Sequence, residues 1–138
     1  MSNIANNDIK GEWSFLQGQY ESYEKFSLLI KLSGVGLISI AYFLDSIDVL
    51  IVFVLLVLWM QDSIWKTFQS RIETRLLQIE KFILKAEDGK AYQFNSEYLK
   101  KRLRNIELIS EYLQQAVRPT VAFPHCVLIV MSGILIIL

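Results

Sequence analysis

Long apolar blocks alternate with polar segments along the chain. The last block covers residues 120–138, where 14 of 19 residues are apolar and none carries a formal charge. The first covers residues 26–44, where 13 of 19 residues are apolar and Lys31 is the only charge. A helix of this length spans roughly 28 Å, close to the ~30 Å hydrocarbon core of a bilayer. Both blocks therefore predict membrane-spanning helices.

Between them lies an unbroken apolar run of 12 residues, 49–60. Extended to 47–65, this run reaches a membrane-spanning length and has Trp59 and Trp65 near one end, where tryptophans favour the membrane interface. A soluble domain of 138 residues is too small to surround three helices that are apolar on every side. We therefore expect an all-α integral membrane protein with three transmembrane helices, the first two forming a hairpin over 26–62.

The basic residues are distributed unevenly around these blocks. Residues 63–119 hold 11 of the 14 Lys and Arg residues, and the other three precede or begin the first span. No basic residue lies at the tip between spans one and two, or after Arg118. The positive-inside rule then predicts a cytoplasmic N-terminus, a cytoplasmic segment 63–119 and a C-terminus on the outer side.

Within this cytoplasmic segment, apolar residues recur at three- and four-residue spacings over 64–86 and again over 96–117. The pattern predicts two helices, and the short connection between them favours a long antiparallel helical hairpin between spans two and three. Its apolar stripes are Phe68, Ile72, Leu76, Ile79 and Ile83 on the first helix, and Leu99, Leu103, Ile106, Leu113 and Val117 on the second. Two helices cannot cover all of this apolar surface, so we expect a homo-oligomer or a further helix to cover the rest.

The N-terminal segment 1–25 is predicted to be a cytoplasmic amphipathic helix. Its apolar stripe consists of Trp13, Leu16, Tyr20 and Tyr23. We interpret it as a helix that packs on the cytoplasmic hairpin and continues into span one. The alternative is an interfacial anchor or a helix that docks a partner.

Composition and candidate chemistry exclude several classes of function. Lys and Arg together equal Asp and Glu at 14 each, which disfavours nucleic-acid binding. His125 and Cys126 are the only residues of their kinds, and neighbours on a helix point about 100° apart. A metal site would need further ligands at that depth. We therefore expect no catalytic residue, no metal, no cofactor and no enzymatic activity.

Polar and small residues of the spans allow two interpretations. We interpret Asp45, Asp48 and Asp62, all near span ends, as solvated. In a ring of subunits, Asp45 and Asp48 could instead form an outer mouth that attracts cations. A second set is assigned to packing between spans, or alternatively to lining a polar path: Ser33, Gly34, Gly36, Ser39, His125, Ser132 and Gly133.

Several short motifs resemble those of small, uncharacterised bacterial inner-membrane proteins. They are Trp65-Lys66-Thr67-Phe68-Gln69, Arg71-Ile72-Glu73, Ile79-Glu80-Lys81-Phe82 and Pro124-His125. A tight membrane hairpin that runs into a cytoplasmic helix is also similar to the SLATT domains, proposed pore-forming effectors of bacterial conflict systems. The chain differs from them in its third span. The resemblance implies a multi-pass protein of the bacterial inner (cytoplasmic) membrane.

Two function classes follow. One is a small oligomeric protein that acts as a pore-forming or membrane-perturbing effector or channel. The other is a non-conducting membrane scaffold or adaptor whose cytoplasmic hairpin docks a partner protein. The partners expected are the lipid bilayer, further copies of the chain and, for the scaffold, a cytoplasmic protein.

Overall fold

The computed structural model describes residues 2–85, 91–100 and 105–138, and every regular element in them is an α-helix. The helices are α1 (Ser2–Phe43), α2 (Val49–Lys85), α3 (Phe94–Lys100), α4 (Asn105–Ala116) and α5 (Pro119–Ile137). The all-α prediction is confirmed. Three helices of the described chain, α1, α2 and α5, are long and apolar enough to cross a membrane, as predicted.

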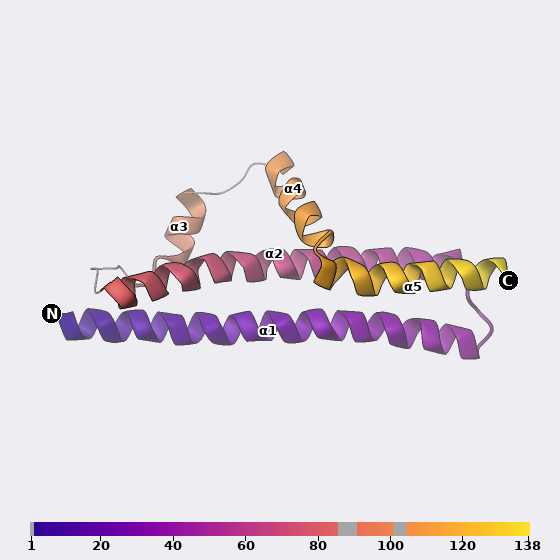
Figure 1. Ribbon diagram of the computed structural model, residues 1–138, viewed down its shortest axis with the longest axis horizontal. Helices are drawn as coiled ribbons and strands as arrows, with labels where there is room; N and C mark the ends of the chain where they lie inside the picture. The colour runs from indigo at the N-terminus through magenta and orange to yellow at the C-terminus, as the bar shows by residue number, and fades with distance from the viewer. Residues whose placement is uncertain (1, 86–90, 101–104) are drawn as a thin grey trace.

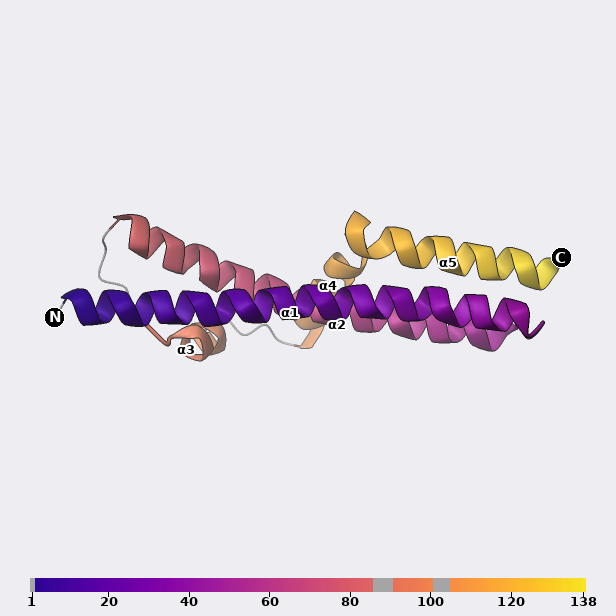
Figure 2. The same ribbon diagram turned by 90° about the horizontal axis from the view of Figure 1, so that it is seen from below.

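Helices α1 and α2 form a long antiparallel pair, and α5 lies beside only one half of it (Figures 1 and 2). We call the half with α5 the three-helix region. The other half, where residues 2–25 of α1 lie along residues 66–85 of α2, is called the stalk. At 42 residues, α1 is about 63 Å long, twice the thickness of a bilayer's hydrocarbon core.

A tight loop joins α1 to α2. Asp45 adopts φ 50°, a left-handed conformation that Asp tolerates better than most residues. The Asp48 carboxylate accepts a hydrogen bond from the Ile51 amide at 3.3 Å, which satisfies one of the free donors at the start of α2. The loop thus sets the two helices antiparallel.

The three-helix region has a compact apolar core. It consists of Ile38, Ala41, Ile51, Leu55 and Leu128. Gly34 lies where α1, α2 and α5 converge, and a Cβ atom placed there would be 3.1 Å from Leu128 Cδ1 and 3.5 Å from Leu55 Cδ2. The absence of a side chain at Gly34 therefore lets the three helices approach closely.

We expect Gly34→Val to destabilise the three-helix region by about 1–3 kcal/mol, because the new methyl groups overlap Leu128 and Leu55. Unfolding by sodium dodecyl sulfate in mixed micelles, followed by circular dichroism, measures this. Gly36→Val is the matched control, since nothing lies within 4 Å of a Cβ at Gly36. Equal losses for the two variants would contradict the close contact at Gly34.

The stalk has a separate core between α1 and α2. It consists of Ile9, Leu16, Ile72, Leu76 and Ile79, flanked by Trp13, Tyr20 and Tyr23. The apolar stripe of the N-terminal segment therefore lies against the first stripe of the expected cytoplasmic hairpin. Phe68 and Ile83 of that stripe lie at its edges and stay 37% and 39% exposed.

The second half of the expected hairpin differs from the prediction of one helix over 96–117. The described residues there form two helices, α3 and α4, and Figure 1 shows both leaving α2 at an angle. The second stripe is exposed at Leu99, Ile106, Leu113 and Val117, and Leu103 lies outside the described residues. The physical reason is that α1 already covers the apolar face of α2 in the stalk.

Candidate functional site

The most unusual feature of the three-helix region is a buried polar cluster at its stalk end. Ser27 and Lys31 come from α1, Asp62 from α2 and His125 from α5. The side chains of Asp62, Ser27 and His125 are completely buried. We call these four residues the polar cluster.

The Asp62 carboxylate is the centre of this cluster. Its Oδ1 accepts a hydrogen bond from the Ser27 hydroxyl. Its Oδ2 lies 3.2 Å from His125 Nε2 and 3.6 Å from Lys31 Nζ. Lys31 also donates to Ser27 Oγ at 3.1 Å. A single carboxylate thus joins all three long helices, and Lys31 supplies the charge that compensates its burial.

The His125 ring contacts Trp59 with one face and Asp62 with one edge. Its ring stacks on the Trp59 indole at 6.3 Å between centroids and 10° between planes. Trp59 in turn donates from Nε1 to the Ala116 carbonyl at 3.1 Å. Because a carboxylate oxygen only accepts, Nε2 carries the proton toward Asp62. Nδ1 is buried without a hydrogen-bond partner among the described residues, as is Ser132 Oγ two turns further along α5.

The geometry of the polar cluster limits its chemistry. The Ser27 hydroxyl bonds to the carboxylate and not to the imidazole, so the three side chains do not form a nucleophile–base–acid chain. Among the described residues, no group of three His, Cys, Asp or Glu side chains could hold a metal ion. What the cluster can do is fix the register of α5 against the α1–α2 pair.

The interpretation of Asp62 as a solvated span end is wrong, because its side chain is 0% exposed. The chain folds Lys31 and His125 onto it from two other helices. Asp45 and Asp48, in contrast, are exposed in and beside the α1–α2 loop. The structure therefore separates the three acidic residues into one buried centre and two exposed loop positions.

The residues assigned to packing between spans, or to a polar path, divide into three groups. Gly34, His125 and Ser132 face the interior of the three-helix region. Ser33 and Ser39 are exposed and donate to carbonyls of their own helix, at Leu29 and Val35. Gly36 and Gly133 are half-buried, with nothing within 4 Å of a Cβ placed at either. The exposed members leave a small-residue surface on α1 that no helix of the described chain covers.

Sequence reasoning missed Ser27 and Lys31 as partners of Asp62. One signal was present: Lys31 and Asp62 lie 15 and 16 residues from Ser46, in the loop. In an antiparallel helical hairpin with a tight loop, residues equally distant from the loop lie at the same level. Opposite charges at matched distances therefore predict a pair across the hairpin.

Buried ion pairs also cross the stalk. Arg75 and Glu12 form two parallel hydrogen bonds at 2.9 and 3.1 Å, with only 6% and 5% of their side chains exposed. The Tyr92 amide adds a third bond to Glu12 at 2.6 Å. This arrangement satisfies both charges inside an otherwise apolar contact and fixes the chain near residue 92 to the stalk.

Two further pairs lie closer to the three-helix region. Lys66 donates to Glu24 at 2.6 Å and to Gln69 at 2.9 Å. Arg71 donates to Glu111 of α4 at 2.8 Å. Burial alone would lower the pKa of Arg71, but hydrogen bonds and attraction to Glu111 outweigh it and raise the pKa. Arg71 is therefore a permanent cation that holds α4 to α2.

Glu24 gives a pH-dependent contact. Hydrogen bonds from Lys66, and next from Gln69, hold the pKa of Glu24 below its ordinary value of 4.5. A lowered folded-state pKa stabilises the fold above the ordinary value, and this contribution is lost as pH falls through the lowered value.

We therefore expect the Glu24 carboxyl carbon to titrate below pH 4.5 in an NMR experiment on the chain in detergent micelles. Lys66→Met should raise the midpoint, because it removes the strongest hydrogen bond. A midpoint that does not respond to Lys66→Met would contradict the assigned cause.

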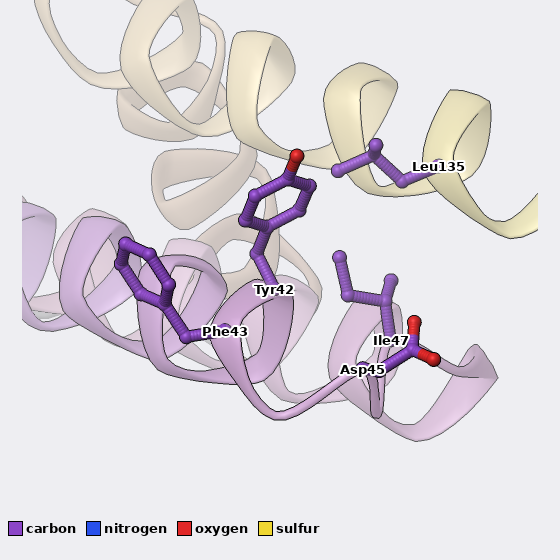
Figure 3. Close-up of a pocket in the computed structure, with 5 residues that line it drawn as sticks. All are labelled: Tyr42, Phe43, Asp45, Ile47 and Leu135. Carbon is purple, nitrogen blue, oxygen red and sulfur yellow. The ribbon is translucent and has the colours of Figure 1, made fainter.

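A cavity of about 400 Å³ opens at the other end of the three-helix region. Figure 3 shows Tyr42, Phe43 and the loop residues Asp45 and Ile47 on one side and Leu135 of α5 on the other. The cavity is thus a gap between the α1–α2 loop and the end of α5, and Asp45 is the only formal charge in its lining.

Comparison of the chain with models of protein families, with curated proteins and with solved structures finds no match.

Proposed function

We propose that the three-helix region crosses the inner membrane of a bacterium and that the stalk, α3 and α4 lie in the cytoplasm. The support is twofold. Outward-facing side chains of the three long helices are large and apolar, among them Leu29, Phe53, Val130 and Ile134. None of the 14 basic residues lies in the sequence of the α1–α2 loop or after Arg118, as the positive-inside rule requires for a cytoplasmic stalk. The C-terminus is then on the outer side.

We further propose that several copies assemble and together form a pore or perturb the membrane. The observation that carries this proposal is the uncovered surface of α1 with Ser33, Gly36 and Ser39. Small residues allow helices of neighbouring copies to approach closely. Their hydroxyls can also line a path, and the exposed Asp45 and Asp48 lie at its outer end. The described residues of one chain enclose no such path, so conduction requires an assembly.

The assembly is tested by native mass spectrometry of the complex in nanodiscs, followed by ion flux in vesicles. A ring of four or more copies that conducts supports the pore. A monomer or dimer without flux contradicts it. Gly36→Val should reduce the number of associated copies while the fold of each copy is retained.

If the outer mouth is formed by loop carboxylates, Asp45→Asn combined with Asp48→Asn should lower cation flux several-fold, because the local negative potential that attracts cations is lost. The measurement is potassium efflux from vesicles at low ionic strength. Asp8→Asn, an exposed charge at the far end of α1, is the matched control and should leave flux unchanged. Unchanged flux in the double variant would exclude the outer mouth.

A second candidate is a non-conducting scaffold. Specific support comes from the polar cluster: Lys31 and His125 both contact Asp62 inside a single chain. The stalk also exposes Leu77 and Leu84, by 52% and 84%, where a partner protein could dock. A photo-crosslinker at Leu77 of the full chain in cells tests this function, with Glu21, exposed on α1, as the control position. Adducts heavier than a dimer at Leu77 alone would favour the scaffold.

A further inference from the structure

Helix α4 has an apolar face that no part of the described chain covers. Ile106, Ile109 and Leu113 of α4, and Val117 directly after it, follow one another at spacings of three and four residues and are 84%, 57%, 62% and 70% exposed. Such spacing places them on one side of a helix. Figure 1 shows that α4 leaves the bundle sideways, whereas α1, α2 and α5 run along its length.

Two hydrogen bonds determine which way this face is turned. At the end of α4, the Ala116 carbonyl accepts from Trp59, within the apolar part of α2. Five residues earlier in α4, Glu111 binds Arg71. Arg71 lies twelve residues after Trp59 on α2, or about 18 Å closer to the end of the stalk. The Glu111 side chain therefore points away from the three-helix region.

Helix geometry then turns the apolar face the other way. Ile109 and Leu113 are each two positions from Glu111, about 160° around the helix. They therefore point in the direction of the three-helix region, but they lie beside it and do not pack into it. Glu107, the other carboxylate of α4, lies on the side of Glu111. The polar side of α4 thus faces the stalk, and its apolar side faces the end of the three-helix region where α5 begins.

The connection to α5 fixes α4 at that level. Only Val117 and Arg118 separate the end of α4 from Pro119, the first residue of a helix long and apolar enough to cross a membrane. Arg118 is exposed at this junction. A cation at this point complements anionic lipid headgroups.

We propose that α4 is an interfacial helix that lies on the stalk-side leaflet of the membrane, with its apolar face among the lipid chains and Arg118 at the headgroups. This inference depends on the proposed insertion of the three-helix region in a membrane. It assigns the lipid surface, and not a second copy or a partner protein, to the uncovered face of α4. The amphipathic pattern, the orientation and the tether are those of helices that lie in the membrane plane.

Spin labelling of the full chain tests this proposal. Cys126→Ser removes the native thiol, and single cysteines replace Leu113, Gln114 or Val130 in nanodiscs of phosphatidylethanolamine and phosphatidylglycerol. Gln114 is the matched control, since it is the exposed neighbour of Leu113 on the polar side, and Val130 is an exposed apolar position of α5. Electron paramagnetic resonance then measures how accessible each label is to oxygen and to a water-soluble nickel chelate.

The expected result is a label at Leu113 that oxygen reaches far better than nickel, at a shallower depth than Val130, and the reverse preference at Gln114. Ile109→Cys should behave as Leu113→Cys does, which guards against a local effect of one substitution. Nickel access at Leu113 equal to that at Gln114 would overturn the proposal. So would protection of Leu113 from both reagents, because a protein would then cover the face. Nickel access at Val130 would instead overturn the proposed membrane insertion.

Discussion

Arg75→Met should lower the free energy of unfolding by roughly 3–5 kcal/mol, because it leaves the Glu12 carboxylate buried without its charge partner. The Tyr92 amide alone cannot compensate that burial. Chemical unfolding of the chain in detergent, followed by the fluorescence of Trp13 beside this pair, measures the loss. The variant should also loosen the chain near residue 92 from the stalk.

The double variant Glu12→Leu with Arg75→Met provides the control. It removes both charges and fills the space with apolar atoms, and replacement of a buried ion pair in this way is often neutral or stabilising. We expect it to recover most of the stability lost in Arg75→Met. A double variant as unstable as the single one would show that the hydrogen bonds of the pair, and not the buried charge, dominate.

The long helices and the apolar spans could be predicted from sequence because they depend on local pattern. The apolar run 49–60, extended to 47–65, predicts a helix long and apolar enough to cross a membrane, and α2 is such a helix. The first hairpin stripe does not by itself identify its packing partner, but the apolar stripe of the N-terminal segment predicts one, and in the structure the two stripes pack together. Ile72, Leu76 and Ile79 form a stripe whichever helix covers them, and in the structure α1 covers them.

The pairing of α1 with α2 follows from chain geometry that the sequence contains in part. Two unbroken helices joined by a tight loop start side by side, and packing between their apolar faces keeps them in contact further along. Glu24 and Lys66, 22 and 20 residues from Ser46, therefore meet in the stalk. Charge pairs nested around a loop are thus a usable signal for helical hairpins, independent of apolar periodicity.

The burial of Asp62 could be foreseen only in part. Its pairing with Lys31 follows from the matched distances to the loop, but the position of His125 depends on the path of the chain through α3 and α4. That path contains short helices and turns, and their local sequence pattern does not predict the register of α5 against α1 and α2. The contribution of α5 to the polar cluster therefore required the folded structure.

The second large effect is expected at Asp62 itself. Asp62→Ala should destabilise the three-helix region by about 3–5 kcal/mol, because Lys31, Ser27 and His125 all lose their common acceptor inside an apolar bundle. Unfolding by sodium dodecyl sulfate in mixed micelles measures the loss, and the fluorescence of Trp59, stacked on His125, reports on α5.

Two further variants separate charge from hydrogen bonding at this position. Asp62→Asn keeps an acceptor for Ser27 but leaves Lys31 without its counter-charge, so its loss should be intermediate. Adding Lys31→Met to Asp62→Asn removes the uncompensated cation and should restore part of the stability. The Asp62 carboxylate alone joins α5 to α1 and α2 within the polar cluster. The α1–α2 pair is also held by the stalk core and by the Glu12–Arg75 pair. The loss of Asp62 should therefore release α5 before α1 and α2 separate. Simultaneous release of all three helices would contradict that role for the polar cluster.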